Sequence, residues 1–146
     1  MTARVEFALV PIAALRPHER VDAAKVRRLA ADLARAGVFE EPVLVARGSN
    51  VILNGHHRVA ALRELGATRV PVWEVDYASD AVDLDRWTPG PPISKDEVLR
   101  HAAEGQLFPI RTTRHRWKID PGRRPTPLTE LGIPNGGAPG RRASSR

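Results

Sequence analysis

Two histidines and an arginine follow Asn-Gly in the segment 54–58, between a short apolar run and a helical pattern. A strand that ends here and continues as a helix leaves backbone N–H groups unpaired, and the helix dipole adds about half a positive charge. Gly55 lets a ligand approach the backbone closely. Cationic side chains at this end of a helix are unfavourable by roughly 0.3–1 kcal/mol each unless an anion offsets them. His56, His57 and Arg58 therefore point to an anionic ligand such as a phosphate.

Two other interpretations of this segment stay open. Neutral histidines at the solvent-exposed start of a helix would need no ligand at all. Metal coordination is disfavoured, because adjacent helical residues point about 100° apart, whereas histidines at positions i and i+4 chelate. The chain also contains no cysteine. We therefore expect no metal site made by protein side chains.

A second basic cluster lies near the C-terminal end, in the segment 107–117, Leu-Phe-Pro-Ile-Arg-Thr-Thr-Arg-His-Arg-Trp. Arginine offers a two-pronged donor to phosphate and threonine offers a short hydroxyl donor. The candidate phosphate ligands are Arg111, Thr112, Thr113, Arg114 and His115. Two alternatives remain for this cluster: an exposed basic loop without a ligand, and a nucleic-acid contact that uses Trp117.

A single carboxylate completes the set of candidate catalytic groups. Glu19 follows the first apolar segment in Arg-Pro-His-Glu-Arg, a polar stretch that reads as a loop. A carboxylate beside a bound hydroxyl group can act as a general base. Spacing alone does not separate this role from that of an ordinary surface glutamate.

Composition limits the kind of protein that positions these residues. A chain of 146 residues with 42% hydrophobic content is sufficient for one domain with a single core. No apolar run approaches the roughly 18–20 residues of a membrane helix, so we expect no membrane association. Absence of cysteine excludes disulfides and thiol catalysis and is consistent with the cytoplasm. The sequence leaves the oligomeric state open.

The positive charge is concentrated at one end of the chain. The net charge is +6, yet residues 118–146 hold six of the 23 basic residues and two of the 17 acidic ones. The body of the protein is therefore close to neutral, which argues against nucleic acid as its partner. Residues 118–146 are rich in Pro, Gly, Arg and Ser, and we expect them to form a disordered tail. The predicted domain spans 1–117.

Hydrophobic periodicity predicts an α/β domain. The expected order is strand, helix, strand, strand, helix, strand, followed by an extended segment and a further helix. Asp22 and Gly37 are expected to bound the first helix, and Ser94 with Glu97 forms a capping box before the last one. Such an order predicts a small mixed sheet with helices packed against it. The expected ranges are strands at 5–15, 42–46, 51–53, 70–77 and 81–87, and helices at 23–36, 56–65 and 94–104.

Three stretches together resemble a known family. Arg-Pro-His-Glu at 16–19, Asn-Gly-His-His-Arg at 54–58 and Thr-Thr-Arg-His at 112–115 occur in the order typical of the ParB-like free serine kinases. The resemblance covers about residues 7–117. The middle stretch is similar to any ParB N-terminal or sulfiredoxin-like domain, whereas His-Glu together with Thr-Thr-Arg-His selects the kinase branch.

The resemblance implies a ParB/sulfiredoxin-like fold and a reaction. A phosphoryl group would pass from ATP or ADP, with Mg²⁺, to the hydroxyl of free L-serine or a related hydroxy amino acid. The catalytic residues would be Glu19, Asn54 and His56. Glu19 would be the base that accepts the hydroxyl proton, and Trp87 would line the amino-acid pocket. Two groups would hold phosphate: Gly55, His56, His57 and Arg58 on one side, and Arg111, Thr112, Thr113, Arg114 and His115 on the other.

Two departures from the family pattern bear on this prediction. Asn54 stands where the family has Asp before Gly-His-His-Arg, so a catalytic role for this residue would have to use a neutral amide. Arg111 stands where the family has Lys. Two alternatives to the kinase follow: a ParB-type nucleotide-dependent DNA-binding protein, which calls for a helix-turn-helix after residue 93, and a regulatory protein that binds nucleotide without turnover.

Overall fold

The computed structural model describes residues 5–118 and 120–133. A four-stranded sheet forms its centre, and its strands run in the spatial order β1-β5-β3-β4. In chain order the elements are β1 (Val5–Pro11), η1 (Ile12–Ala14), α1 (Ala23–Ala36), β2 (Val38–Phe39), β3 (Val43–Ala46), β4 (Ile52–Asn54), α2 (His56–Glu64), β5 (Arg69–Val75), β6 (Val82–Arg86), α3 (Lys95–Glu104), β7 (Thr113–Trp117), β8 (Thr126–Pro127) and η2 (Leu128–Leu131).

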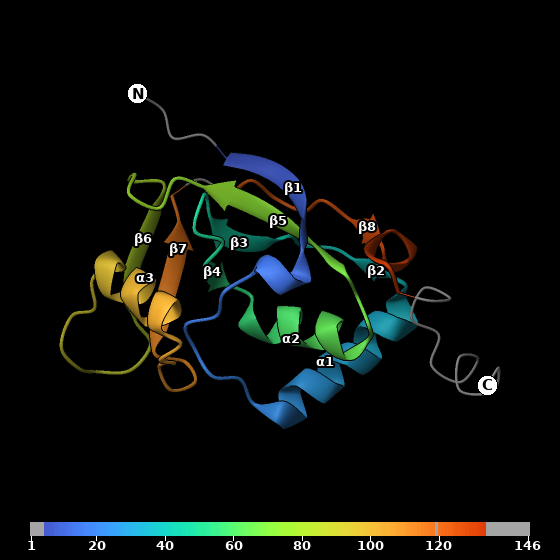
Figure 1. The fold of residues 1–146 in the computed structure, drawn as a ribbon, viewed down its shortest axis with the longest axis horizontal. Coiled ribbons are helices and arrows are strands. Elements are labelled where there is room, and N and C mark those ends of the chain that lie inside the picture. The colour runs from blue at the N-terminus through green and yellow to red at the C-terminus, as the bar shows by residue number, and fades with distance from the viewer. Residues whose placement is uncertain (1–4, 119, 134–146) are drawn as a thin grey trace.

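The central sheet is mixed, as the sequence predicts. β1 and β5 pair antiparallel over seven residues, β5 and β3 pair parallel, and β3 turns back antiparallel into β4. Two short antiparallel pairs, β2 with β8 and β6 with β7, flank this sheet. Figure 1 shows the two flanking pairs at opposite ends of the central sheet. The order of the predicted elements along the chain is confirmed.

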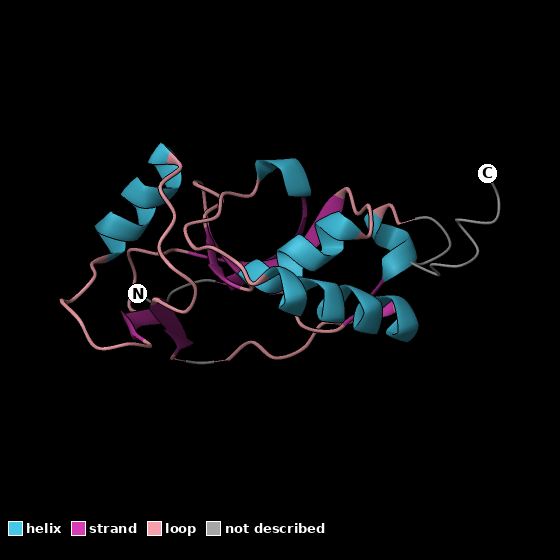
Figure 2. Ribbon diagram, turned by 90° about the horizontal axis from the view of Figure 1, so that it is seen from below, coloured by secondary structure: helices cyan, strands magenta, loops and turns pink. Residues whose placement is uncertain are grey.

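Strand β3 divides the hydrophobic core, because successive side chains of a strand point to opposite faces. Val43 and Val45 pack in the cluster that contains Val59 and Leu62 of α2. Leu44 and Ala46 belong instead to the cluster that contains side chains of β6 and α3. Helix α1 packs on α2, and the two helices lie alongside each other in Figure 2.

The helix ends form as predicted. The Asp22 side chain accepts a hydrogen bond from the backbone of Ala24, and Gly37 ends α1 in the left-handed conformation. Ser94 and Glu97 make the reciprocal bonds of a capping box before α3. None of the helices among residues 5–118 and 120–133 is both long and apolar enough to cross a membrane.

The C-terminal prediction needs correction. Disorder was expected from residue 118 onward, but Leu128 and Leu131 are fully buried and Ile133 is 3% exposed in the main core. Burial of three apolar side chains within eight residues suffices to anchor the segment. The Pro-rich composition around them predicted disorder, so their contribution to the core was not recognised from the sequence. The structure therefore extends the folded unit past the predicted boundary at 117. The remainder of the predicted tail, 134–146, lies outside the described residues.

Candidate active site

Isolated β-bridges fix the segment that carries Glu19, whose side chain is half-buried. Arg16 forms a β-bridge with Val51, next to β4. Further on, the backbone N–H of Phe108 donates to the carbonyl of His18 at 2.8 Å, and the N–H of Arg20 donates to the carbonyl of Phe108 at 2.9 Å. The segment that contains Glu19 is thereby pinned on two sides, and its side chain faces the turn that precedes β7.

Both carboxylate oxygens of Glu19 accept hydrogen bonds from that turn. Oε1 accepts from the backbone N–H of Arg111 at 3.2 Å. Oε2 accepts from the backbone N–H of Thr113 at 2.7 Å and from the Thr113 hydroxyl. Arg111 adopts a left-handed backbone with φ of 61°, which costs a non-glycine residue of order 1 kcal/mol and turns both N–H groups toward one point. Glu19 occupies that point.

His18 completes the support of the carboxylate. The side chain is fully buried, and its Nε2 lies 2.8 Å from the hydroxyl oxygen of Thr113. Because the Thr113 hydroxyl donates to Glu19, the imidazole must donate to Thr113. Burial lowers the pKa of His18 to about 4, so the ring is neutral at physiological pH. A chain of donors therefore runs from His18 through Thr113 to Glu19.

Gly55 begins α2 beside this carboxylate. Its φ is 112°, and a Cβ atom there would lie 3.0 Å from both the Arg58 guanidinium and a Val43 methyl. Only glycine meets both conditions. The first N–H groups of α2 have no helical acceptor, so the predicted anion-binding end of the helix is present.

The two histidines of this turn are not cationic, contrary to the expectation of a positive side-chain cluster. His56 Nε2 accepts the backbone N–H of His18 at 3.1 Å, and His57 Nε2 accepts that of Asp22 at 3.0 Å. Burial, reinforced by His18 and His115, lowers the pKa of His56 well below its ordinary value. Burial also lowers the pKa of His57, helped by the positive charge of Lys25. Each neutral ring then carries its proton on Nδ1 and can act as a donor.

Two predicted phosphate ligands lie outside the pocket that the others form. The Arg58 guanidinium donates to the carbonyl of Glu41 and stands 5.7 Å from the centre of the Phe39 ring. The Thr112 hydroxyl donates to the carbonyl of Pro109 at 2.7 Å. Each side chain donates a hydrogen bond to a backbone carbonyl of the protein itself. Their places in the sequence motifs therefore reflect support of the loop and helix.

Arg114 and Arg111 stand against Trp87, which is 54% exposed at the edge of the pocket. The Cζ atoms lie 4.9 Å and 5.9 Å from the centre of the indole ring. Asp85 holds Arg114 through two bonds, 2.7 Å from Nε and 2.8 Å from one terminal nitrogen. The same contact lowers the pKa of Asp85. Arg114 is thus oriented by an ion pair, whereas Arg111 has no ion-pair partner among the described residues.

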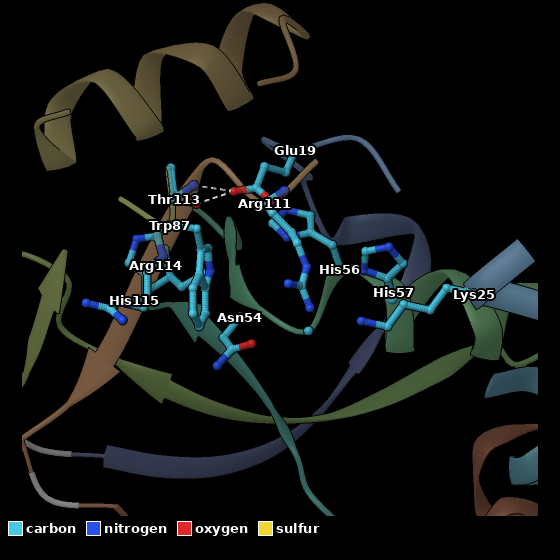
Figure 3. A pocket seen from close by; sticks show the side chains of 12 residues that line it. Glu19, Lys25, Asn54, His56, His57, Trp87, Arg111, Thr113, Arg114 and His115 are labelled. Atoms are coloured by element: carbon cyan, nitrogen blue, oxygen red, sulfur yellow. Dashed lines mark hydrogen bonds between the residues drawn. The ribbon is translucent and has the colours of Figure 1, made fainter. Parts of the chain in front are cut away.

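These segments meet around one pocket of about 180 Å³ (Figure 3). Most of the predicted site residues line it, and Figure 3 shows the Asn54 and Glu19 side chains at opposite ends of the group. The lining residues are Glu19, Lys25, Leu53, Asn54, Gly55, His56, His57, Trp87, Arg111, Thr113, Arg114 and His115. No group of three or more His, Cys, Asp or Glu side chains suited to a metal ion occurs in 5–118 and 120–133.

Four residues that support the site were missed by the sequence interpretation: Lys25, Asp85, His18 and Tyr77. Lys25 lies in the first turn of α1, where a cation is as unfavourable as at the start of α2. The helix dipole therefore also indicates Lys25 as a candidate anion ligand. Tyr77 contacts His115 Nε2 through its hydroxyl at 2.6 Å. Nothing in their spacing indicates the roles of Asp85 and Tyr77, because both depend on how β6 and β7 pair.

Comparison with known proteins places this arrangement among its relatives. No protein-family model matches the chain. An ADP-dependent L-serine kinase of Thermococcus kodakarensis is 29% identical over 125 residues, which is 83% of this chain and 52% of that protein. An ATP-dependent L-serine kinase of Staphylothermus marinus is 33% identical over 89 residues, covering 58% of this chain and 35% of the enzyme. Over most of its length, the chain is thus similar in sequence to an L-serine kinase.

Two solved structures show the same fold. A free serine kinase in complex with AMP superposes with a TM-score of 0.78 at 18% identity and covers 88% of this chain and 94% of the other. C-terminally truncated SbnI from Staphylococcus aureus gives 0.72 at 13% identity, covering 88% and 90%. The α/β fold that the resemblance to these kinases implies is therefore confirmed. The chain spans about half or less of the length of the curated kinases above.

Proposed function

We propose that the protein transfers a phosphoryl group from ATP or ADP to the hydroxyl of free L-serine or a related hydroxy amino acid. One observation carries this proposal. Glu19, the start of α2 and the 111–115 segment lie far apart in the sequence, yet they line a single pocket. Sequence similarity to the named ADP- and ATP-dependent L-serine kinases supports the same reaction. The folded unit that performs it would be residues 1–133, and its proposed location is the cytoplasm.

Glu19 is placed to act as the general base. Oε2 already accepts two hydrogen bonds, whereas Oε1 accepts a single longer one and keeps a free lone pair. In the proposed step, the acceptor hydroxyl oxygen bonds to the terminal phosphorus as its proton passes to Oε1. The bond from that phosphorus to the nucleotide oxygen breaks, and AMP or ADP leaves.

Positive groups would stabilise the charge that develops during transfer. Phosphoryl transfer depends mainly on positioning and electrostatics. Arg111 and Arg114 line the pocket, and His57 can donate through Nδ1. These side chains and the free N–H groups at the start of α2 would contact the phosphates of the nucleotide. The sequence predicts part of this role for every residue of the Gly-His-His-Arg turn. Trp87 would bound the acceptor.

Mg²⁺ fits this pocket only as a partner of the nucleotide. The lining has one carboxylate, which is already hydrogen-bonded, and one uncommitted neutral oxygen on Asn54. Mg²⁺ commonly retains waters and takes phosphate oxygens as ligands, so such a set suffices. When bound, the ion would neutralise phosphate charge.

A neighbouring pocket supplies room for the rest of the nucleotide. It has a volume of about 490 Å³ and shares Glu19 and His56 with the first. Its apolar wall includes Ile52, Val59 and Leu107. An apolar wall of this kind suits the faces of a nucleoside.

The DNA-binding alternative lacks its expected module. Among residues 5–118 and 120–133, α3 is the only α-helix after residue 93, so a helix-turn-helix is absent from the described part of the chain. The pocket residues are better accounted for by a small anionic ligand. A steep loss of DNA affinity with added salt would favour the alternative.

The direct test is phosphotransfer. The protein is incubated with ATP or ADP, Mg²⁺ and L-serine, L-threonine or L-homoserine, and products are followed by phosphorus NMR. We expect O-phosphoserine or its analogue, and no product with any pair would overturn the proposal. Glu19→Gln should still bind nucleotide but lose roughly 10²–10⁴-fold in turnover. Glu104→Gln, on the exposed end of α3, is the matched control and should keep full turnover.

A further inference from the structure

The pocket presents many uncommitted donors. Lys25 is half-buried and makes no hydrogen bond or ion pair with another described residue. The Arg111 guanidinium lies 5.9 Å from the centre of the Trp87 ring and makes no hydrogen bond or ion pair with the side chain of another described residue. His56 and His57 use Nε2 as acceptors, so their remaining ring nitrogens carry protons. A carboxylate entering the pocket therefore meets positive charge and free donors.

Negative groups are scarce in the same walls. Glu19 is the only acidic residue among the described pocket residues, and three hydrogen bonds already hold its carboxylate. Asp85 lies behind Arg114 and is occupied by it. At the end of the pocket away from Glu19, Asn54 offers one neutral amide oxygen. The remaining negative oxygen among the described lining residues is Glu19 Oε1, and the proposed reaction uses this oxygen for the acceptor hydroxyl, not for an ammonium group.

This imbalance discriminates between the two charged ends of an amino acid. A hydrogen bond to a charged group contributes about ten- to a hundredfold in affinity when the partner is suitable. The acceptor's carboxylate has such a partner in Lys25. Its ammonium group finds a neutral amide at best, so the ammonium adds little to binding.

Resting on the kinase function proposed above, we infer that the pocket selects its acceptor by carboxylate and hydroxyl and not by the ammonium group. The acceptor class is then 3-hydroxy carboxylic acids in general, with or without a 2-amino group. L-glycerate, which carries a hydroxyl where L-serine carries the ammonium, belongs to it. The transfer step is unchanged: the primary hydroxyl oxygen gains the phosphoryl group and its proton passes to Glu19.

The matched pair L-serine and L-glycerate tests this inference. Dissociation constants are measured by calorimetry with the full chain, with and without AMP, so that no transfer occurs. We expect the two constants to agree within about tenfold. Tighter binding of L-serine by more than this factor, or no binding of either acid, would overturn the inference.

Substitution of Asn54 gives the second arm. Asn54→Asp adds the missing negative charge and should raise the preference for L-serine over L-glycerate by about ten- to a hundredfold. Asn54→Gln keeps a neutral amide and serves as the matched control, with the preference unchanged. An Asn54→Asp protein with the same preference as the parent would count against the inference.

Lys25 gives the third arm. Lys25→Met should weaken both acids equally, because both carry the carboxylate, whereas Arg28→Met on the exposed side of α1 should weaken neither. Equal affinity of the Lys25→Met protein and the parent would contradict the assignment. Binding of both acids without phosphotransfer would support this inference and overturn the kinase, whereas transfer to L-serine alone would do the reverse.

Discussion

Thr113 holds the Glu19 carboxylate through both its backbone N–H and its hydroxyl, across 94 residues of sequence. These two donors bind the same oxygen, Oε2, and leave Oε1 as the more accessible one. The base is therefore fixed in direction before any substrate binds. Such preorganisation increases the rate of the chemical step, because a misplaced catalytic group loses the advantage of proximity.

Removal of the Thr113 hydroxyl should slow the reaction. Thr113→Val keeps the size and the backbone N–H but loses one hydrogen bond to a charged group, which contributes about 1.5–3 kcal/mol. We expect kcat to fall by about ten- to a hundredfold with the KM for nucleotide little changed. Steady-state kinetics measures both constants.

Thr112→Val is the matched control for that substitution. The neighbouring hydroxyl donates to the carbonyl of Pro109 and does not line the pocket. Its loss should reduce the free energy of unfolding but leave kcat near that of the parent. Equal loss of kcat in both variants would show that the turn, and not the hydroxyl of Thr113, matters.

Acid should destabilise the fold through its buried histidines. Burial lowers the pKa of His18 to about 4 and that of His115 to about 3, from an ordinary 6.5. Below pH 6.5 the unfolded chain takes up protons on these rings while the folded protein does not. The free energy of unfolding should therefore fall as the pH drops from about 6.5 toward 4, by about 1.4 kcal/mol per unit for each ring that the unfolded chain has protonated.

Urea unfolding at pH 7 and pH 5 measures this dependence. His18→Gln removes one of the buried rings whose pKa is lowered, so its unfolding free energy should change less between the two pH values. His115→Gln should behave alike. A parent protein with the same unfolding free energy at both pH values would contradict burial of neutral rings.

Local patterns predicted most of this fold, and tertiary contacts explain what they missed. The caps at Asp22 and Ser94 depend only on neighbouring residues, so the sequence places them correctly. The charge state of His56 could not be predicted, because its hydrogen-bond donor lies 38 residues away. Lys25 enters the pocket only because α1 packs on α2. Asp85 reaches Arg114 only because β6 pairs with β7.

The C-terminal anchor should be essential to stability. Leu131 is fully buried in the main core, and a buried leucine replaced by alanine typically costs about 2–5 kcal/mol. Leu131→Ala should lower the free energy of unfolding by this amount in urea titration. Leu9→Ala, at a site that is 36% exposed, should cost clearly less. Equal losses of unfolding free energy in the two variants would show that the segment 126–133 stabilises the fold no more than a surface residue does. The predicted domain boundary at 117 would then be correct.

The two arginines beside Trp87 should differ in their tolerance of lysine. Arg114 meets Asp85 through a planar fork of two hydrogen bonds, which a lysine cannot reproduce. Arg111 has no such partner among the described residues and offers mainly its charge. Arg114→Lys should therefore raise the KM for nucleotide by about tenfold, whereas Arg111→Lys should leave it within about twofold of the parent. The KM of each variant for ATP and ADP distinguishes a role of side-chain orientation from a role of charge alone. Equal effects at the two positions would mean that Asp85 does not position Arg114 for the phosphates.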